Sequence, residues 1–231
     1  MSRHVVHVYK DFWPPVVGGI ERTLYWMGTE FVRRGWRVTA LVNSRTRETR
    51  ERDCDGVRVV EVGEWRRAFS APLSPGFPKW LRKLDPDVWH FHIPNPTGDV
   101  SALLRPPRAP MVATYHSDIV RQKWALSAYG PFLRAFLRRC ETIMPTSPHL
   151  IESSPFLRPL RDKCEVVPLG LPLEGFERTA EAGLRAREVK RRFKGFPVVI
   201  FVGKLRYYKG LQFLVSAMRG LPHVQCAIVG E

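Results

Sequence analysis

A glycine pair between a strand-like segment and a helix-like segment constrains the fold of this chain more than any other feature. Residues 5–9 form a short apolar run typical of a buried strand, and the apolar residues of 20–34 recur at helical spacing. Two prolines stop the strand, and Gly18-Gly19 lets the backbone pass close to another group where the helix begins and its N–H groups point outward. Such a helix N-terminus favours anions, although the same pattern also fits a plain tight turn.

Strand-like and helix-like segments alternate along most of the chain. Strands are predicted at residues 37–42, 57–62, 87–92, 110–115, 142–145 and 164–167, and helices at 98–104, in the second half of 119–139 and at 147–154. The polar run 43–55 and the aromatic, basic run 63–84 are predicted to be loops. This alternation predicts an α/β protein with a doubly wound parallel sheet and right-handed crossovers.

The pattern restarts after Glu174 and makes one βαβ unit. Its predicted elements are a charged helix, a strand, a second helix and a second strand, at residues 180–193, 197–202, 211–220 and 224–229. A parallel sheet of two strands cannot bury both of its faces. We therefore expect residues 1–174 to form one domain and residues 175–231 to form the incomplete beginning of a second.

Charge is the unusual property of the composition. The chain has 37 Lys and Arg residues against 22 Asp and Glu residues, which gives a formal net charge of +15. This balance favours phosphate groups, nucleic acid or anionic lipid as partners, although a general arginine bias would give the same total without any partner.

Cysteine spacing and hydropathy argue against several other classes of protein. The four cysteines are widely scattered, with the spacing of neither a zinc site nor a disulfide framework, so we expect them to be reduced. No apolar run approaches the roughly 18 residues of a membrane span, and no apolar signal-peptide core follows Met1. A cytoplasmic location is expected.

Aromatic and cationic side chains are interleaved between Trp65 and Lys83, among prolines and glycines. Together with Arg121, Lys123 and Trp124, they have the composition of a surface that docks on a membrane interface or stacks on bases. A solvated loop with a few aromatic residues in the core has the same composition. We expect the segment to be exposed and to bind anionic lipid reversibly at the inner face of the cell membrane.

Polar residues follow two of the predicted strands. His92 ends one strand and is followed by Asn95, and His116 comes directly after the next strand and is followed by Asp118. An open α/β sheet builds its site from residues at the carboxyl ends of its strands. A lone histidine is more often structural than catalytic, but two histidines at equivalent strand ends favour a functional site.

Six motifs occur along the chain in the order found in a known enzyme family. They are Pro-Val-Val-Gly-Gly-Ile-Glu-Arg, Asp-Val-Trp-His-Phe-His, Thr-Tyr-His-Ser-Asp, Pro-Thr-Ser-Pro, Val-Val-Pro-Leu-Gly and Phe-Val-Gly-Lys-Leu-Arg-Tyr-Tyr-Lys-Gly. With these motifs the chain resembles the retaining glycosyltransferases of family 4, which have the GT-B fold. It is most similar to bacterial mannosyl- and rhamnosyltransferases that build surface polysaccharides. The resemblance implies a Rossmann-like N-terminal domain that binds the acceptor and a C-terminal domain that holds a sugar nucleotide.

The resemblance also implies a donor site. Gly18 and Gly19 resemble the loop that approaches the donor diphosphate, and Lys204 and Lys209 resemble the basic pair that clamps it. Preorganised cations and N–H groups stabilise the negative charge that develops on a departing nucleoside diphosphate. Lys204 stands where the family often has arginine, so a bidentate phosphate contact is lost at that position.

Further residues are assigned on the same resemblance. His116 resembles the histidine beside the transferred sugar, with Asp118 expected to act beside it, and His92 and Asn95 are expected to bind the acceptor. The family's carboxylate motif for the donor would lie beyond Glu231, so residues 1–231 alone are expected to transfer no sugar. Neither a cofactor nor a metal is expected, because the lysines and the helix dipole can take the metal's role.

The expected reaction is the transfer of a sugar, with retention, from a UDP- or GDP-sugar to a glycan or lipid-linked acceptor. A nicotinamide-dependent oxidoreductase would need Gly-x-Gly-x-x-Gly after the first strand, and the sequence does not supply it there. The alternative is a basic α/β module that binds nucleic acid or a membrane without catalysis. Nucleic-acid binding of that kind would depend steeply on salt and little on sequence, and we expect no nucleic-acid partner.

Overall fold

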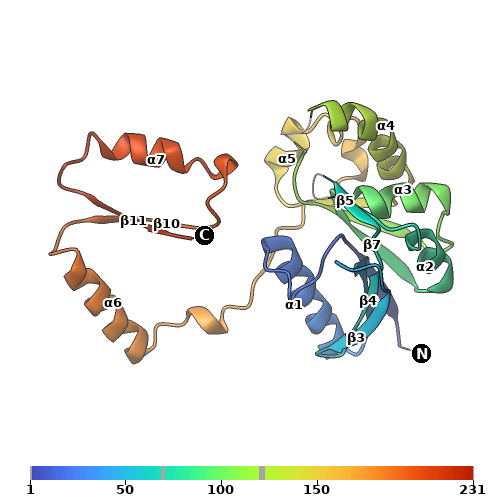
Figure 1. Ribbon diagram of the computed structural model, residues 1–231, viewed down its shortest axis with the longest axis horizontal. Helices are drawn as coiled ribbons and strands as arrows, with labels where there is room; N and C mark the ends of the chain where they lie inside the picture. The colour runs from blue at the N-terminus through green and yellow to red at the C-terminus, as the bar shows by residue number, and fades with distance from the viewer. Residues whose placement is uncertain (1, 69–70, 120–122, 231) are drawn as a thin grey trace. The chain divides into compact units, whose positions relative to one another are not determined.

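The computed structural model describes residues 2–68, 71–119 and 123–230. The chain divides into two compact units, Met1–Pro172 and Leu173–Glu231, and Figure 1 traces the chain through both. Each unit has a sheet of its own, mostly parallel in the first unit and parallel in the second.

The first unit is built on a seven-stranded sheet in the order β3-β4-β2-β1-β7-β8-β9. The strands are β1 (His4–Val8), β2 (Arg37–Asn43), β3 (Arg50–Cys54), β4 (Val57–Val62), β7 (Val88–Ile93), β8 (Met111–Tyr115) and β9 (Thr142–Pro145). All neighbours are parallel except β3 and β4. The chain builds outward from β1 through β2 and β4, then crosses to the other side of β1 to add β7. This reversal is a topological switch point, where open α/β sheets bind ligands outside the carboxyl ends of the strands. The predicted doubly wound parallel sheet is confirmed.

Helix α1 (Gly19–Arg33) covers one face of this sheet. Its Leu24 is fully buried in one cluster with Val5 and Val38. Gly28 comes so close to the sheet that an added Cβ atom would lie 3.0 Å from Cγ2 of Val57. The helical spacing of apolar residues therefore sets which face of α1 packs inward, and Leu24→Ala would cost about 2–5 kcal/mol of stability.

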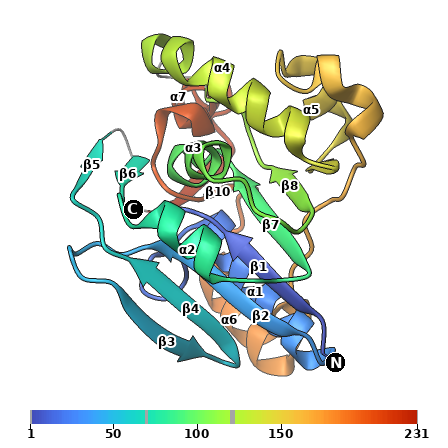
Figure 2. The same cartoon turned by 90° about the vertical axis from the view of Figure 1, so that its right-hand side faces the viewer.

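Three helices cover the opposite face of the sheet, and Figure 2 shows α2 and α3 in front of it with α1 behind. The three are α2 (Phe77–Lys83), α3 (Pro96–Leu104) and α4 (Lys123–Arg139). Phe91 on β7 meets Phe136 on α4 edge to face, with 4.9 Å between ring centroids. Successive strand residues point to opposite faces, so Trp89 and Phe91 enter this core while His90 and His92 face the α1 side.

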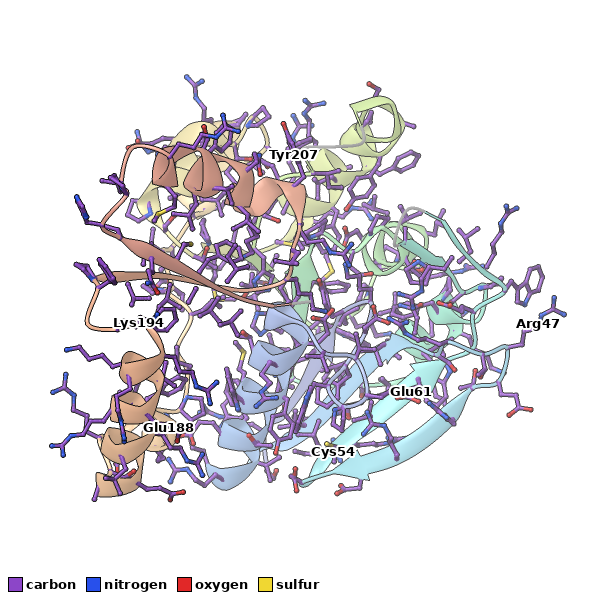
Figure 3. The ribbon with its side chains drawn as sticks, turned by 60° about the vertical axis from the view of Figure 1, so that its left-hand side comes forward. Arg47, Cys54, Glu61, Glu188, Lys194 and Tyr207 are labelled. Carbon is purple, nitrogen blue, oxygen red and sulfur yellow. The ribbon has the colours of Figure 1, made fainter. Side chains whose placement is uncertain are left out.

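The structure corrects the prediction of a loop at residues 43–55. Residues Arg50–Cys54 form β3, an antiparallel edge strand on β4. Its charged side chains lack the apolar alternation by which a strand is predicted. In the structure they pair across the ladder, where the guanidinium groups of Arg50 and Arg52 both contact the buried carboxylate of Glu61. Figure 3 labels Glu61 and Cys54 in this part of the sheet. An edge strand needs only one hydrogen-bonded neighbour, and charged residues discourage further pairing.

Two more element predictions differ from the structure. The predicted loop at 63–84 contains helix α2 and a hairpin of β5 (Arg66–Ala68) and β6 (Ala71–Leu73). The predicted strand at 164–167 is only an isolated bridge between Ile143 and Cys164. The 3₁₀ helix η1 (Arg158–Lys163) precedes this bridge, and the short helix α5 (Pro148–Ser153) precedes η1.

The second unit contains the predicted βαβ arrangement. Its elements are η2 (Glu174–Phe176), α6 (Ala180–Arg192), β10 (Val198–Val202), η3 (Tyr207–Lys209), α7 (Leu211–Met218) and β11 (Gln225–Val229). β10 and β11 pair in parallel, and Thr179 caps α6 by accepting a hydrogen bond from the backbone N–H of Ala182. Among the helices of the described residues, none combines the length and apolar character needed to cross a membrane.

Candidate active site at the carboxyl edge of the sheet

The glycine turn before α1 gives its two glycines different roles. A Cβ atom on Gly18 would lie 2.0 Å from Oε2 of Glu21, whereas a Cβ atom on Gly19 would meet no atom within 4 Å. Gly18 therefore makes room for the buried carboxylate of Glu21, which is also favourably placed in the first turn of the helix. The open space at Gly19 is the part of the turn where an external group can approach the helix N-terminus.

Three histidines, two in strands and one directly after a strand, form a hydrogen-bonded chain on the α1 face. Nδ1 of His7 lies 3.2 Å from Nε2 of His92, and Nδ1 of His92 lies 3.1 Å from Nε2 of His116. His7 lies in β1, His92 in β7, and His116 directly follows β8, with its backbone N–H bonded to the carbonyl of Ile93. The three residues lie on one face of the sheet. The strands are parallel and in register, and every second side chain along a strand points to the same face.

Burial keeps this histidine chain neutral near pH 7. Desolvation lowers the pKa of His7 to about 4 and the pKa of His116 to about 4. For His92, desolvation and then the neighbouring histidines lower the pKa well below its usual value. His90 stacks on His92 and bonds Oγ1 of Thr114 at 2.7 Å, and its pKa is lowered for the same reasons.

The structure places His92 behind His116 rather than at the surface. His92 is fully buried, and other histidines occupy both of its ring nitrogens. In this arrangement His92 has no ring nitrogen left to contact the acceptor substrate, which is the contact predicted for it. His116 is partly exposed at the carboxyl edge, and its ring lies 6.5 Å from that of Tyr9, which follows β1. His116 is thus the partly exposed member of this chain of histidines, at the carboxyl edge of the sheet.

Asp118 contacts other partners than His116 in the described part of the chain. Its Oδ1 accepts hydrogen bonds from Oη of Tyr115 at 2.6 Å and from Oγ of Ser154 at 2.8 Å. Ser154 is the C-cap residue of α5, so the carboxylate ties the segment after β8 to the end of that helix. Desolvation, followed by this carboxylate, raises the pKa of Tyr115. Asp118 therefore supports the backbone on which His116 lies.

Asn95 is also buried, at the N-cap of α3. It packs so tightly on Gly98 that a Cβ atom there would lie 2.5 Å from Nδ2 of Asn95. Neither polar atom of its side chain has a hydrogen-bond partner among the described residues. One turn later, the carboxyl group of Asp99 accepts a hydrogen bond from Oη of Tyr129, and burial raises the pKa of Asp99 to about 8. Asn95 does not reach the surface in this structure.

Sequence reasoning missed His7, Asp99 and Tyr129. His7 lies inside β1 between apolar residues, and this pattern alone does not distinguish a site residue from a structural one. Asp99 and Tyr129 are 30 positions apart, and only the packing of α3 on α4 brings them together.

The second unit holds both predicted phosphate-binding lysines near one end of β10. Lys204 follows β10 by two residues, and Lys209 ends η3 directly before the N-cap of α7. Both side chains are exposed. Gly210 supplies that N-cap with φ at +71°, a conformation that favours glycine.

Among the described residues, His7, His90 and His92 form a group compact enough to hold a metal ion, with one nitrogen of each lying within 4.8 Å of the others. The hydrogen bonds to His7 and His116 occupy both nitrogens of His92. Burial is the largest cause that lowers the pKa of each of these three histidines, and the same burial disfavours the charge of a divalent ion.

The basic, aromatic segment is only partly exposed. Trp65 is 71% exposed, but Phe77 is fully buried. The guanidinium group of Arg67 pairs with Asp11 at 2.9 Å and with Glu64 at 2.8 Å, so this cation is structural. Arg121 lies outside the described residues, as do the side chains of Lys123 and Trp124.

Three cations around one cavity make a more defined surface, which we call the cationic patch. Lys79 and Arg82 on α2 and Arg105 after α3 line, with Pro78, a cavity of ≈ 330 Å³. None of these cations forms an ion pair with an acidic residue of the described ranges. Arg82 and Arg105 lie where α2 and α3 end and the chain turns toward the amino ends of β7 and β8. The patch therefore lies toward the opposite edge of the sheet from His116.

Two bacterial proteins share sequence with this chain over nearly all of its length. It is 34% identical to the O-antigen chain mannosyltransferase C of Escherichia coli over 215 residues, which cover 92% of this chain and 57% of that protein. It is 32% identical to the D-rhamnosyltransferase WbpZ of Pseudomonas aeruginosa over 218 residues, which cover 94% of this chain and 56% of that protein. The chain thus spans little more than half the length of these relatives.

Solved structures share the fold at low sequence identity. The sucrose-phosphate synthase of Thermosynechococcus elongatus matches with a TM-score of 0.73 and 17% identity over 99% of this chain and 62% of that chain. Anabaena Alr3699/HepE in complex with UDP and glucose matches with a TM-score of 0.69 and 15% identity over 99% of this chain and 61% of that chain. The model of Glycosyltransferase Family 4 matches residues 17–174, more than half of the sequence. By this match and the two relatives, the chain belongs to glycosyltransferase family 4.

Proposed function

We propose that the full-length protein transfers a sugar, with retention, from a nucleoside diphosphate sugar to a glycan or lipid-linked acceptor. Family membership and the names of the two relatives support glycosyl transfer, and the matching Anabaena structure was solved with UDP and glucose. The observation that carries the proposal is the placement of His116 at the carboxyl edge, where three strands bring a neutral histidine chain to the switch point.

The proposed roles follow from chemistry and position. His116 contacts the transferred sugar, Gly19 leaves space for a phosphate at the start of α1, and Lys204 and Lys209 stabilise the charge on the departing diphosphate. In this proposal the first unit binds the acceptor and the second begins the donor-binding domain. His92 acts behind His116 instead of on the acceptor.

A panel of UDP- and GDP-sugars tests this function in the full-length chain. One sugar nucleotide should raise the melting temperature and serve as a donor in a transfer assay with isolated lipid-linked glycan. Lys209→Ala should weaken that thermal shift, while Lys190→Ala on α6 provides a control for the loss of one exposed cation. The nucleic-acid alternative would be supported if no sugar nucleotide raised the melting temperature or served as a donor, while the protein bound DNA and RNA of any sequence with steep salt dependence.

The same proposal places the protein at an anionic membrane surface through the cationic patch. Lys83 lies 4.1 Å from the ring centre of Trp80 on the same helix, so aromatic and cationic groups are combined on α2. Each cation near an anionic lipid surface contributes about 1 kcal/mol, and a few such contacts give reversible binding. The patch and Trp80 support this location better than Arg67 does, because the charge of Arg67 is already paired with Asp11 and Glu64.

A further inference from the structure

We infer that His7, His92 and His116 act as one tautomeric relay, in which His7 and His92 are positioning residues that decide which nitrogen of His116 carries its proton. The inference rests on the proposed function only in placing His116 beside a substrate. Its structural basis is the pair of hydrogen bonds at 3.2 and 3.1 Å that join the three rings.

The two hydrogen bonds leave only two arrangements of protons. A neutral imidazole has one N–H, and each hydrogen bond needs one donor and one acceptor. If His92 donates from Nδ1 to His116, its Nε2 is bare and must accept from Nδ1 of His7, and His116 then carries its own proton on Nδ1. If His116 donates from Nε2 instead, every proton in the relay moves to Nε2. All three rings therefore carry the proton on the same type of nitrogen.

The two ends of the relay differ in what they face. Nε2 of His7 and Nδ1 of His116 are both buried and without a partner among the described residues. His7 is at least nine-tenths buried and contacts the ring of Phe31 on α1, whereas His116 is partly exposed at the carboxyl edge. An N–H at the His7 end would be a buried donor without an acceptor, which proteins avoid. Nδ1 of His116 is itself covered in this structure, but its ring is partly exposed at the carboxyl edge, so a small shift of that ring lets water or a substrate oxygen reach an N–H at this end.

The relay therefore favours the arrangement in which the proton of His116 lies on Nδ1, because the partly exposed end of the relay can find an acceptor and the His7 end cannot. In this form His116 is a hydrogen-bond donor to a hydroxyl or phosphate oxygen and has no bare nitrogen facing the substrate to act as a base. His7, on the central strand, controls this choice through His92 without touching the substrate. Fixing the tautomer of a reactive histidine through its hidden nitrogen is a general use of a positioning residue.

Nitrogen NMR on the full-length chain tests the relay without any substrate. Histidine labelled with ¹⁵N in the ring shows directly whether Nδ1 or Nε2 carries the proton, and single substitutions assign the signals. We expect Nδ1–H in His7, His92 and His116, measured with a chelator present. Different nitrogens protonated in His92 and His116, or Nε2–H in all three, would overturn the inference.

Variants distinguish a relay from ordinary packing. His7→Phe removes the first donor and should convert His116 to a mixture of tautomers, while His7→Asn keeps an N–H donor near the Nδ1 position and should preserve Nδ1–H. His90→Phe is the matched control, because His90 packs on the same rings but bonds Thr114 outside the relay. An unchanged His116 tautomer in a folded His7→Phe protein would contradict the relay. If that protein does not fold, the tautomers of His92 and His116 in the wild-type protein alone decide whether the relay exists.

Kinetics add a readout that depends on the proposed function. In the transfer assay, His7→Phe should lower kcat by about 10- to 100-fold, as loss of an orienting partner does, with the donor KM within about twofold of wild type. His90→Phe should change neither constant by more than about twofold. A protein with the expected tautomers but no transfer from any sugar nucleotide would support the relay and contradict the proposed function.

Discussion

Nδ1 of His92 lies 3.1 Å from Nε2 of His116, although 24 residues separate them in sequence. Parallel pairing of β7 with β8 produces this contact, because His92 lies beside Thr114 in the ladder and His116 follows two residues later on the same face. A fully buried histidine is thereby attached to a partly exposed one at the carboxyl edge. This relationship makes the inner rings part of the site even though they do not reach its surface.

Substitution of the two glycines before α1 should separate a packing role from a binding role. Gly18→Ala should lower the free energy of unfolding by about 1–3 kcal/mol, because its Cβ atom would displace the buried carboxylate of Glu21. Gly19→Ala should cost less than about 0.5 kcal/mol, because the space beside it is open. Urea unfolding measures both. A double-mutant cycle with Glu21→Ala should remove most of the cost of Gly18→Ala, and an undiminished cost would show that another contact is responsible.

Asp99→Asn should stabilise the protein in a pH-dependent manner. Burial raises the pKa of Asp99 to about 8, so the folded state holds a proton that the unfolded state releases near pH 4. The folded state binds more protons in this window, and wild-type stability falls as pH rises from about 4 to 8. Asp99→Asn removes this loss and should gain about 1–3 kcal/mol at pH 8 and little at pH 4. An equal effect at both pH values would mean that Asp99 is ionised in the folded protein.

The buried histidines should have the opposite effect on stability. Their pKa values lie below the ordinary value near 6.5, reaching about 4 for His7 and His116, so the unfolded state binds more protons between pH 4 and 6.5. Stability should therefore fall as the solution is acidified through this window, by up to about 3 kcal/mol for each of these two residues. Denaturant unfolding in the Asp99→Asn background isolates this slope. His149→Gln, at an exposed position, is the control and should leave the slope as it is; a flat profile would mean that the buried rings are charged or accessible.

The cationic patch should determine binding to anionic vesicles at low salt. Replacing Lys79, Arg82 and Arg105 together with serine removes about 3 kcal/mol of attraction, or about a hundredfold in partitioning. The triple replacement of Arg185, Arg187 and Lys190 on α6 with serine makes the same change in net charge with residues that do not belong to the patch, and should retain most of the binding. Sedimentation with anionic and neutral liposomes measures both proteins. Equal losses in the two variants would show that net charge alone causes the association.

The sheet could be predicted from sequence because its buried strands are short apolar runs between turn residues. The sequence did not indicate β3, since Arg50 and Arg52 are matched to Glu61 only when the strand pairs with β4. Helix α2 was hidden by Gly76 and Pro78, which resemble a turn although they lie at its N-terminus.

The site was predictable only in its outline. His116 could be located because it directly follows a recognisable strand. The burial of His92 and Asn95 could not, because it depends on which neighbouring strands and helices cover them. His7 joins the site through the register of β1 with β7, which a single strand does not specify.

Sugar transfer by the full-length protein with His116 altered in two ways tests the central claim most directly. His116→Ala removes the donor at the carboxyl edge and should lower kcat by about 10²- to 10⁴-fold, whereas His116→Asn keeps an N–H near the Nδ1 position and should lose about tenfold or less. Both variants should melt within a few degrees of wild type. Turnover that follows this order with one UDP- or GDP-sugar supports a glycosyltransferase whose substrate is held by His116. Equal turnover in all three proteins, or none in wild type with any sugar nucleotide, would contradict it.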